Sequence, residues 1–138
     1  MADYVLDKDI KELLSVDIAV PVPLWRSKEK DRGFNQSALL AEAFCKRTGM
    51  ACDEGFLVRS RNTKPQKGLG RGERQENLRD AFELNDGRSA ENKSFLIIDD
   101  IFTTGATVFE CAKTLYAEGA DRVCYLALSS PAKRRYDI

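Results

Sequence analysis

Short blocks of apolar residues alternate along this chain with longer stretches in which apolar residues recur at helical spacing. The clearest block is residues 94–98, and similar blocks stand at residues 17–22, 56–58, 81–84 and 123–128. Apolar blocks of this length are typical of buried strands. Their alternation with helical stretches predicts an α/β fold with a mostly parallel sheet flanked by helices.

Two helices are expected between these strands. The first follows Asn35, whose side chain can accept hydrogen bonds from free N–H groups at a helix start. It stops at Gly49, because glycine suits the left-handed position after a helix. The second helix follows Gly105 and ends at Gly119. Each predicted helix follows a strand and a loop, which is the repeating unit of this fold class.

The segment 59–79 has almost no apolar residues apart from Leu69 and Leu78, and it is predicted to be a long, mobile, basic loop. Its basic side chains are Arg59, Arg61, Lys64, Lys67, Arg71, Arg74 and Arg79. A basic run is usually a solvated surface, whereas loops of this length in compact domains are usually functional or disordered. Both explanations stay open on the sequence pattern alone.

Length and charge limit the classes of function. The chain has 138 residues, which suits one compact domain, and its 22 Lys and Arg residues balance its 22 Asp and Glu residues. This balance argues against general attraction to nucleic acid or anionic lipid, so any anion site has to be local. The sequence has no apolar run long enough for a membrane span and no secretory signal, so a cytoplasmic location is expected.

The histidine and cysteine content suggests neither a histidine base nor a zinc site. The chain has no histidine, which excludes a histidine general base. Its four cysteines, Cys45, Cys52, Cys111 and Cys124, are scattered and lack the close spacing of a zinc site. They are expected to be reduced structural thiols.

Candidate chemistry is concentrated after the strand predicted at 94–98. The buried apolar strand ends in two adjacent acids, Asp99 and Asp100, and a helix is expected to begin inside residues 103–107, Thr-Thr-Gly-Ala-Thr. Ligands of parallel sheets bind beyond the carboxyl ends of strands. Free N–H groups at a helix start and threonine hydroxyls suit a phosphate, and glycine lets the backbone approach it closely. The pattern therefore predicts a phosphate site.

A structural explanation competes with this prediction, because acids that cap turns and threonines that cap helices are common in α/β proteins. For an isolated Asp-Asp pair the structural explanation is the better one, but the complete pattern favours function. Two carboxylates beside a phosphate imply intervening hydroxyl groups or a hard cation such as Mg²⁺. A ribose 5-phosphate meets this condition.

Residues 95–107 resemble the motif that binds 5-phosphoribosyl 1-pyrophosphate (PRPP) in type I phosphoribosyltransferases: four apolar residues, two acids, two variable residues and Thr-Thr-Gly-Ala-Thr. The resemblance implies that Asp99 and Asp100 hold the ribose 2- and 3-hydroxyls and bind Mg²⁺ directly or through ribose or water. It also implies that the loop and the helix start hold the 5-phosphate. The residues concerned are Thr103, Thr104, Gly105, Ala106 and Thr107.

A narrower resemblance covers residues 17–132, nearly the whole chain. Residues 20–24, residues 32–36 and the pair Ala81-Phe82 resemble the ComF-like branch, which is related to competence protein F and often described as predicted amidophosphoribosyltransferases. The further matches are Thr63, Gln66, Leu69, Arg74 and Asn77. Members of that branch usually carry a Cys-rich zinc module in front. Here a single phosphoribosyltransferase-like domain over residues 1–138, without that module, is expected.

The resemblance implies a Mg²⁺-dependent phosphoribosyltransferase that transfers the phosphoribosyl group of PRPP to an acceptor not identified by the sequence and releases pyrophosphate. Arg32, in the loop after the first strand, and Arg74, in the loop that matches the mobile hood of the fold, are the basic candidates for catalysis beside Asp99 and Asp100. Two alternatives stay open: a PRPP-sensing module without catalysis, and a competence module that binds partners in DNA uptake.

Direct nucleic-acid binding is disfavoured, because the net charge is zero and no aromatic residue interleaves the basic ones. Contact with DNA through a competence complex, and a homodimer, are left open. No membrane partner is expected.

Overall fold

The computed structural model describes residues 7–24, 33–60, 70, 72, 80–101 and 104–129. The elements in chain order are α1 (Asp7–Leu14), β1 (Ile18–Pro21), α3 (Gln36–Thr48), β2 (Leu57–Arg59), β3 (Phe82–Leu84), β4 (Ser94–Ile101), α5 (Ala106–Ala117) and β5 (Arg122–Ser129). Among these described residues, no helix is long and apolar enough to cross a membrane. The α/β class predicted from the sequence is confirmed.

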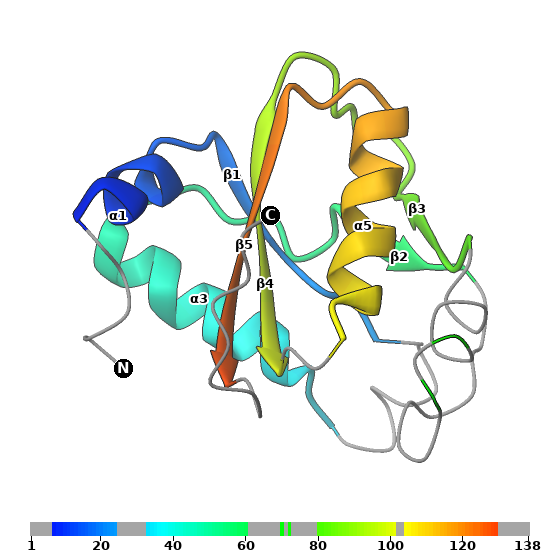
Figure 1. Ribbon diagram of the computed structural model, residues 1–138, viewed down its shortest axis with the longest axis horizontal. Helices are drawn as coiled ribbons and strands as arrows, with labels where there is room; N and C mark the ends of the chain where they lie inside the picture. Colours follow the sequence, from blue (N-terminus) through cyan, green and yellow to red (C-terminus); the bar gives the residue numbers. More distant parts are fainter. Residues whose placement is uncertain are drawn as a thin grey trace.

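A three-stranded parallel sheet forms the centre, with β4 between β1 and β5. In Figure 1, α1 and α3 lie on one side of this sheet and α5 lies on the other. Phe95, Leu96, Ile97 and Ile98 of β4 are 0% exposed, because both faces of the strand are covered. Full burial of a side chain of this size contributes about 1.5–3 kcal/mol, so β4 anchors the fold.

The side chains of β4 alternate between two hydrophobic cores. Phe95 and Ile97 pack into the core that includes residues of α5, and the rings of Phe56 and Phe95 lie 4.9 Å apart. Leu96 and Ile98 pack into the core that includes residues of α3. Successive residues of a strand point to opposite faces, so one apolar run supplies both cores.

Both ends of α3 are stabilised as the sequence predicts. The Asn35 side chain accepts hydrogen bonds from the backbone N–H groups of Ser37, at 3.0 Å, and Ala38, at 3.4 Å. At the other end, Gly49 adopts φ 75° and donates its N–H to the carbonyl oxygen of Cys45 at 2.9 Å. These contacts fix where α3 begins and ends.

Two short strands, β2 and β3, pair antiparallel in a separate sheet beside α5 (Figure 1). Their bounds differ by one residue from the blocks predicted at 56–58 and 81–84. The Thr114 hydroxyl of α5 donates to the carbonyl oxygen of Phe82 at 3.3 Å, which joins the strand pair to the helix.

Arg59, expected in the basic loop, is instead the last residue of β2, and its guanidinium lies 5.6 Å from the centre of the Phe82 ring. Apart from residues 59, 60, 70 and 72, the loop predicted at 59–79 lies outside the described residues, so its role as a hood stays a prediction.

Two features of the fold differ from the sequence-based prediction. The strand expected to end at Ile98 continues to Ile101, because β5 pairs with it through Asp99 opposite Ala127 and Ile101 opposite Ser129. The two acids therefore lie at the end of the strand, where the sequence pattern also places them. The helix α1 was not predicted at all.

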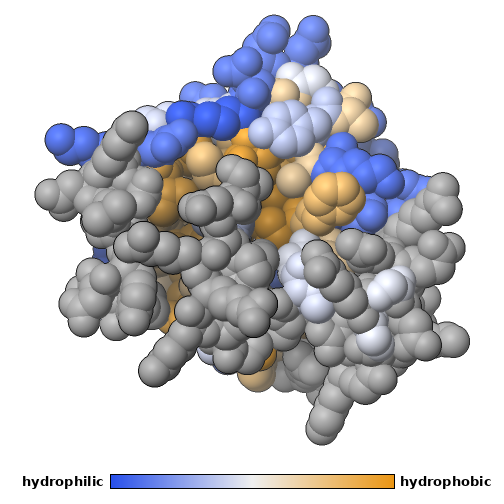
Figure 2. All heavy atoms as spheres, in the orientation of Figure 1, coloured by the Kyte–Doolittle hydropathy of each residue, from blue (hydrophilic) through white to orange (hydrophobic). Residues whose placement is uncertain are grey.

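Apolar residues gather in the middle of the face shown in Figure 2, below a polar upper margin. The exposed large apolar side chains of α5 and β5 are Phe109 (62% exposed), Tyr116 (50%) and Leu128 (46%). The Tyr116 hydroxyl accepts a hydrogen bond from the backbone N–H of Val123 at 3.0 Å. Tyr116 thereby satisfies a backbone donor of β5, the last strand of the described sheet.

Candidate functional site

The carboxyl end of β4, the start of α3 and the start of α5 lie together at one end of the sheet (Figure 1). The backbone N–H of Val22 donates to the carbonyl oxygen of Ile98 at 2.9 Å, which continues the pairing with β4 beyond β1. The Asn35 amide group donates to the carbonyl oxygen of Val22 at 3.1 Å. The start of α3 is therefore held beside the end of the central strand, where parallel sheets bind ligands.

Asp99 is a buried carboxyl group at this end of the sheet, with 8% of its surface exposed. Its Oδ1 accepts hydrogen bonds from the Ser37 hydroxyl at 3.2 Å and from the backbone N–H of Asp100 at 2.8 Å. Burial is the main cause that raises its pKa to about 7, and the adjacent Asp100 carboxyl adds to the increase. Asp99 therefore exchanges a proton near neutral pH.

Asp100 is the more exposed of the two acids. Its Oδ1 accepts a hydrogen bond from the backbone N–H of Ile101 at 3.0 Å, and its carboxyl group lies near enough to that of Asp99 to raise the pKa of Asp99. The pair thus combines a buried and an accessible carboxyl group in direct contact.

The start of α5 has the geometry of an anion cradle. Gly105 precedes the helix with φ 80° and ψ 2°, a left-handed conformation that favours glycine. No side-chain hydrogen bond of the type that Asn35 makes at α3 caps α5 within the described residues. The Thr104 hydroxyl accepts only a long hydrogen bond, 3.4 Å, from the backbone N–H of Ala106. Backbone donors at such a helix start, together with the helix dipole, favour a negative ligand.

The structure brings six of the nine candidate residues to this end of the sheet: Asp99, Asp100, Thr104, Gly105, Ala106 and Thr107. The other three, Arg32, Arg74 and Thr103, lie outside the described residues. Whether the residues of either group act on a ligand stays a prediction.

Ser37 is a site residue that the sequence-based reasoning did not identify. It is buried, with 5% of its surface exposed, and it donates to a carboxylate 62 positions later in the chain. The sequence predicted the Asn35 cap at the start of α3. The contact with Asp99 was not, because it depends on how α3 packs against the sheet.

The two acids fit a magnesium ion by their donor chemistry. Mg²⁺ prefers oxygen ligands and is commonly bound by one or two carboxylates, with water and substrate oxygens completing the shell. Two carboxyl groups in contact repel each other when both are ionised, and a hard cation removes this repulsion. Within the described residues no group of three or more His, Cys, Asp or Glu side chains could hold a metal, so a magnesium ion here would need ligand or water oxygens as well.

No family model matches the chain. The chain is 39% identical over 107 residues to the DNA utilization protein YhgH of Salmonella typhi, a match that covers 78% of this chain and 46% of the relative. It is 33% identical over 102 residues to competence protein ComFC of Bacillus subtilis (74% of this chain, 39% of the relative) and 28% identical over 124 residues to competence protein F of Haemophilus influenzae (87% and 54%).

The chain is a homologue of the ComF-like proteins. It spans about half the length of the curated relatives it matches. The resemblance inferred from the sequence motifs is therefore confirmed.

Solved structures agree with the fold inferred for this ComF-like chain. A hypoxanthine phosphoribosyltransferase of Staphylococcus aureus matches with a TM-score of 0.58 at 22% identity, covering 95% of this chain and 62% of that one. A phosphoribosylpyrophosphate synthetase of Mycobacterium smegmatis matches with a TM-score of 0.53 at 15% identity, covering 87% of this chain and 29% of that one. The ComF-like chain therefore has the phosphoribosyltransferase type I fold.

Proposed function

We propose that this chain binds PRPP with Mg²⁺ and transfers its phosphoribosyl group to a small-molecule acceptor, releasing pyrophosphate. The observation that carries the proposal is the buried Asp99, held by Ser37 and in contact with Asp100, beside the glycine-led start of α5. We further propose that residues 1–138 act as a single domain in this role.

The 5-phosphate is assigned to the start of α5. The left-handed Gly105 has no Cβ, so a phosphate oxygen can approach the backbone there. Thr104 and Thr107 stand on either side of the glycine and Ala106, and their hydroxyl groups can donate to the same phosphate. Thr103 is assigned to this group by the sequence motif.

The ribose is assigned to the two acids. A carboxylate accepts hydrogen bonds from two neighbouring hydroxyl groups, and such charge-assisted bonds contribute about 1.5–3 kcal/mol each. The Ser37 hydroxyl orients the Asp99 carboxyl group, so its position is set before ligand binds. When bound beside this pair, Mg²⁺ would offset the negative charge of the pyrophosphate leaving group.

The basic residues Arg32 and Arg74 are assigned to the pyrophosphate. Displacement at the anomeric carbon passes through a transition state with oxocarbenium character, which needs a stabilised leaving group more than a strong nucleophile. Each tenfold gain in rate needs about 1.4 kcal/mol of preferential stabilisation of the transition state. Several contacts of moderate strength therefore suffice, without a single decisive catalytic residue.

A second candidate function is a PRPP-sensing or partner-binding module in DNA uptake. It is favoured by the names of the related proteins, which refer to competence and DNA utilization. The balance of 22 basic and 22 acidic residues argues against tight direct binding to DNA.

Calorimetry and a pyrophosphate assay distinguish these functions. PRPP should bind with Mg²⁺ and only weakly without it, and the double variant Asp99→Asn, Asp100→Asn should lower the affinity roughly a hundredfold or more, since two charge-assisted contacts are lost. Equal affinity of wild type and double variant would reject the site. Pyrophosphate release with any member of a nucleobase or amine panel identifies a transferase, and PRPP binding without release identifies a sensor.

A further inference from the structure

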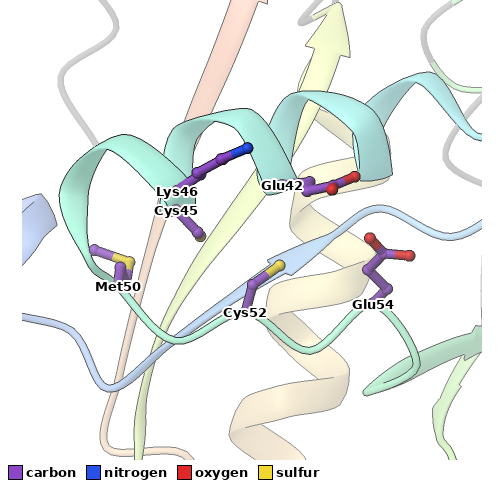
Figure 3. A pocket seen from close by; sticks show the side chains of 6 residues that line it. All are labelled: Glu42, Cys45, Lys46, Met50, Cys52 and Glu54. Carbon is purple, nitrogen blue, oxygen red and sulfur yellow. The ribbon is translucent and has the colours of Figure 1, made fainter.

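A groove lies beside the C-terminal end of α3, at the opposite end of the helix from Ser37 and the candidate PRPP site. It has a volume of about 620 Å³. Its lining residues are Glu42, Cys45, Lys46, Met50, Cys52 and Glu54. Figure 3 shows Cys45 on α3 and Cys52 on the segment below it, with both side chains at the groove. Two thiols that were scattered in the sequence are therefore brought together by the fold.

The backbone explains why these thiols meet. Cys45 is 6% exposed and packs into the core between α3 and the sheet. After Gly49 the chain turns back and runs beside β1, where Cys52 is bridged in parallel to Ala19. Cross-strand neighbours point to the same face of a sheet, and Ala19 belongs to the same core as Cys45. Cys52 therefore points toward α3, on the side of the sheet where Cys45 lies.

Backbone contacts hold this arrangement on both sides of Cys52. The Ala19 N–H donates to the carbonyl oxygen of Ala51 at 2.8 Å, and the Asp53 N–H donates to the carbonyl oxygen of Ala19 at 3.1 Å. On the helix side, Cys45 lies in the last turn of α3. Disulfide formation requires two side chains that approach each other, and here both thiols face one groove from elements that these backbone contacts hold in place.

We propose that Cys45 and Cys52 are a thiol modification site, at which a small-molecule disulfide oxidises the pair to an intramolecular disulfide. Cys52 is exposed and Cys45 is buried, so the reagent meets Cys52 first. The Cys52 thiolate attacks one sulfur of the reagent disulfide and forms a mixed disulfide with it, while the other reagent sulfur leaves as a thiol. The Cys45 sulfur then attacks the Cys52 sulfur and releases the second reagent thiol. Two protein thiols are oxidised and one reagent disulfide is reduced to two thiols.

The surroundings of the pair slow its oxidation at neutral pH. Glu42 and Lys46 of α3 and Glu54 line the groove, while Asp53 is paired with Arg88 at 2.9 Å. Although Cys52 is exposed, partial desolvation of its thiol in the groove, the neighbouring Cys45 and the acids Glu54 and Asp53 raise its pKa to about 12, and burial raises the pKa of Cys45. Only the thiolate attacks a disulfide, so the reaction is slow at neutral pH and faster at higher pH.

The test is peptide mapping of the full chain after incubation with glutathione disulfide. Trypsin cleaves after Lys46 and Arg47, so Cys45 and Cys52 lie on different tryptic peptides and only a disulfide keeps them together. The wild type should lose two of its four free thiols and the mass of two hydrogen atoms, and the peptides of residues 33–46 and 48–59 should appear as one linked species.

Two variants complete the experiment. Cys52→Ser, a change at an exposed position, should lose no pair of thiols and give no linked peptide. Cys124→Ser, the control, should behave as the wild type does. The proposal is overturned by a wild type that keeps four free thiols, by a glutathione adduct that stays on Cys52, or by a linked species that contains Cys111 or Cys124. The outcome does not depend on PRPP binding.

Discussion

Replacing the buried Asp99 by asparagine should stabilise the empty protein above neutral pH while removing a contact to the ligand. Asparagine has nearly the same shape, and its amide oxygen can still accept hydrogen bonds from the Ser37 hydroxyl and the Asp100 N–H. What the variant removes is the ionisable carboxyl group. The change therefore isolates the cost of charging this group inside the fold.

The size of the effect follows from proton linkage. The pKa of Asp99 is about 7 in the folded protein against a model value of 3.8, a difference of roughly three units. Because the folded pKa is raised, full stability is present below about pH 4, is lost progressively as the pH rises from about 4 to 7, and changes no further above that range. Three units correspond to up to about 4 kcal/mol. Asp99→Asn should recover roughly a third of this at pH 5 and nearly all of it at pH 8.

Urea denaturation of wild type and variant at the two pH values measures the difference. The same chemical change at Asp86, an exposed turn residue, is the control for general effects of removing one negative charge. Equal stabilisation by Asp99→Asn at pH 5 and pH 8 would refute the reasoning, since it would show that ionisation of Asp99 does not oppose folding.

Two further changes test the elements that build the site. Asn35→Ala should lower the free energy of unfolding by about 1 kcal/mol in urea denaturation, because the α3 cap is lost, whereas Asn35→Asp keeps the cap and loses only the amide donation to Val22. Gly105→Val should abolish binding of ribose 5-phosphate in calorimetry, because a side chain would enter the cradle. The control is Gly49→Val, which introduces a similar backbone strain at φ 75° where no atoms lie near the added Cβ, and it should leave binding intact. If Gly105→Val also bound ribose 5-phosphate as the wild type does, the phosphate would have to bind elsewhere.

The sequence was sufficient to predict the elements with strong local signals. The apolar run of β4, the Asn35 cap and the glycine after α3 each act through neighbours in the chain, and each is where the pattern placed it. Strand ends were less accurate, because pairing with a neighbour decides them. β4 continues through Asp99 since its backbone groups pair with β5, whatever the side chains are.

Contacts between segments could not be predicted from the sequence alone. Ser37 and Asp99 are 62 positions apart, and only the packing of α3 on the sheet brings them within 3.2 Å. Cys45 and Cys52 are close in sequence, yet their contact depends on the bridge between Cys52 and Ala19 of β1. In each case the missing information was the register of one element against another, which periodicity does not contain.

A comparison within the molecule bears on whether Asp99 is structural or functional. Asp17 is a structural acid: its Oδ2 accepts hydrogen bonds from the N–H and the hydroxyl of Ser94 at 2.8 and 2.9 Å, and these contacts lower its pKa. Asp99 also receives two hydrogen bonds, but burial and the Asp100 carboxyl outweigh them and its pKa rises. A carboxyl group kept only for the fold would be selected toward the first arrangement. The arrangement around Asp99 is unfavourable in the empty protein and becomes favourable only when a ligand supplies hydroxyl donors or positive charge. This supports the functional explanation of the acid pair.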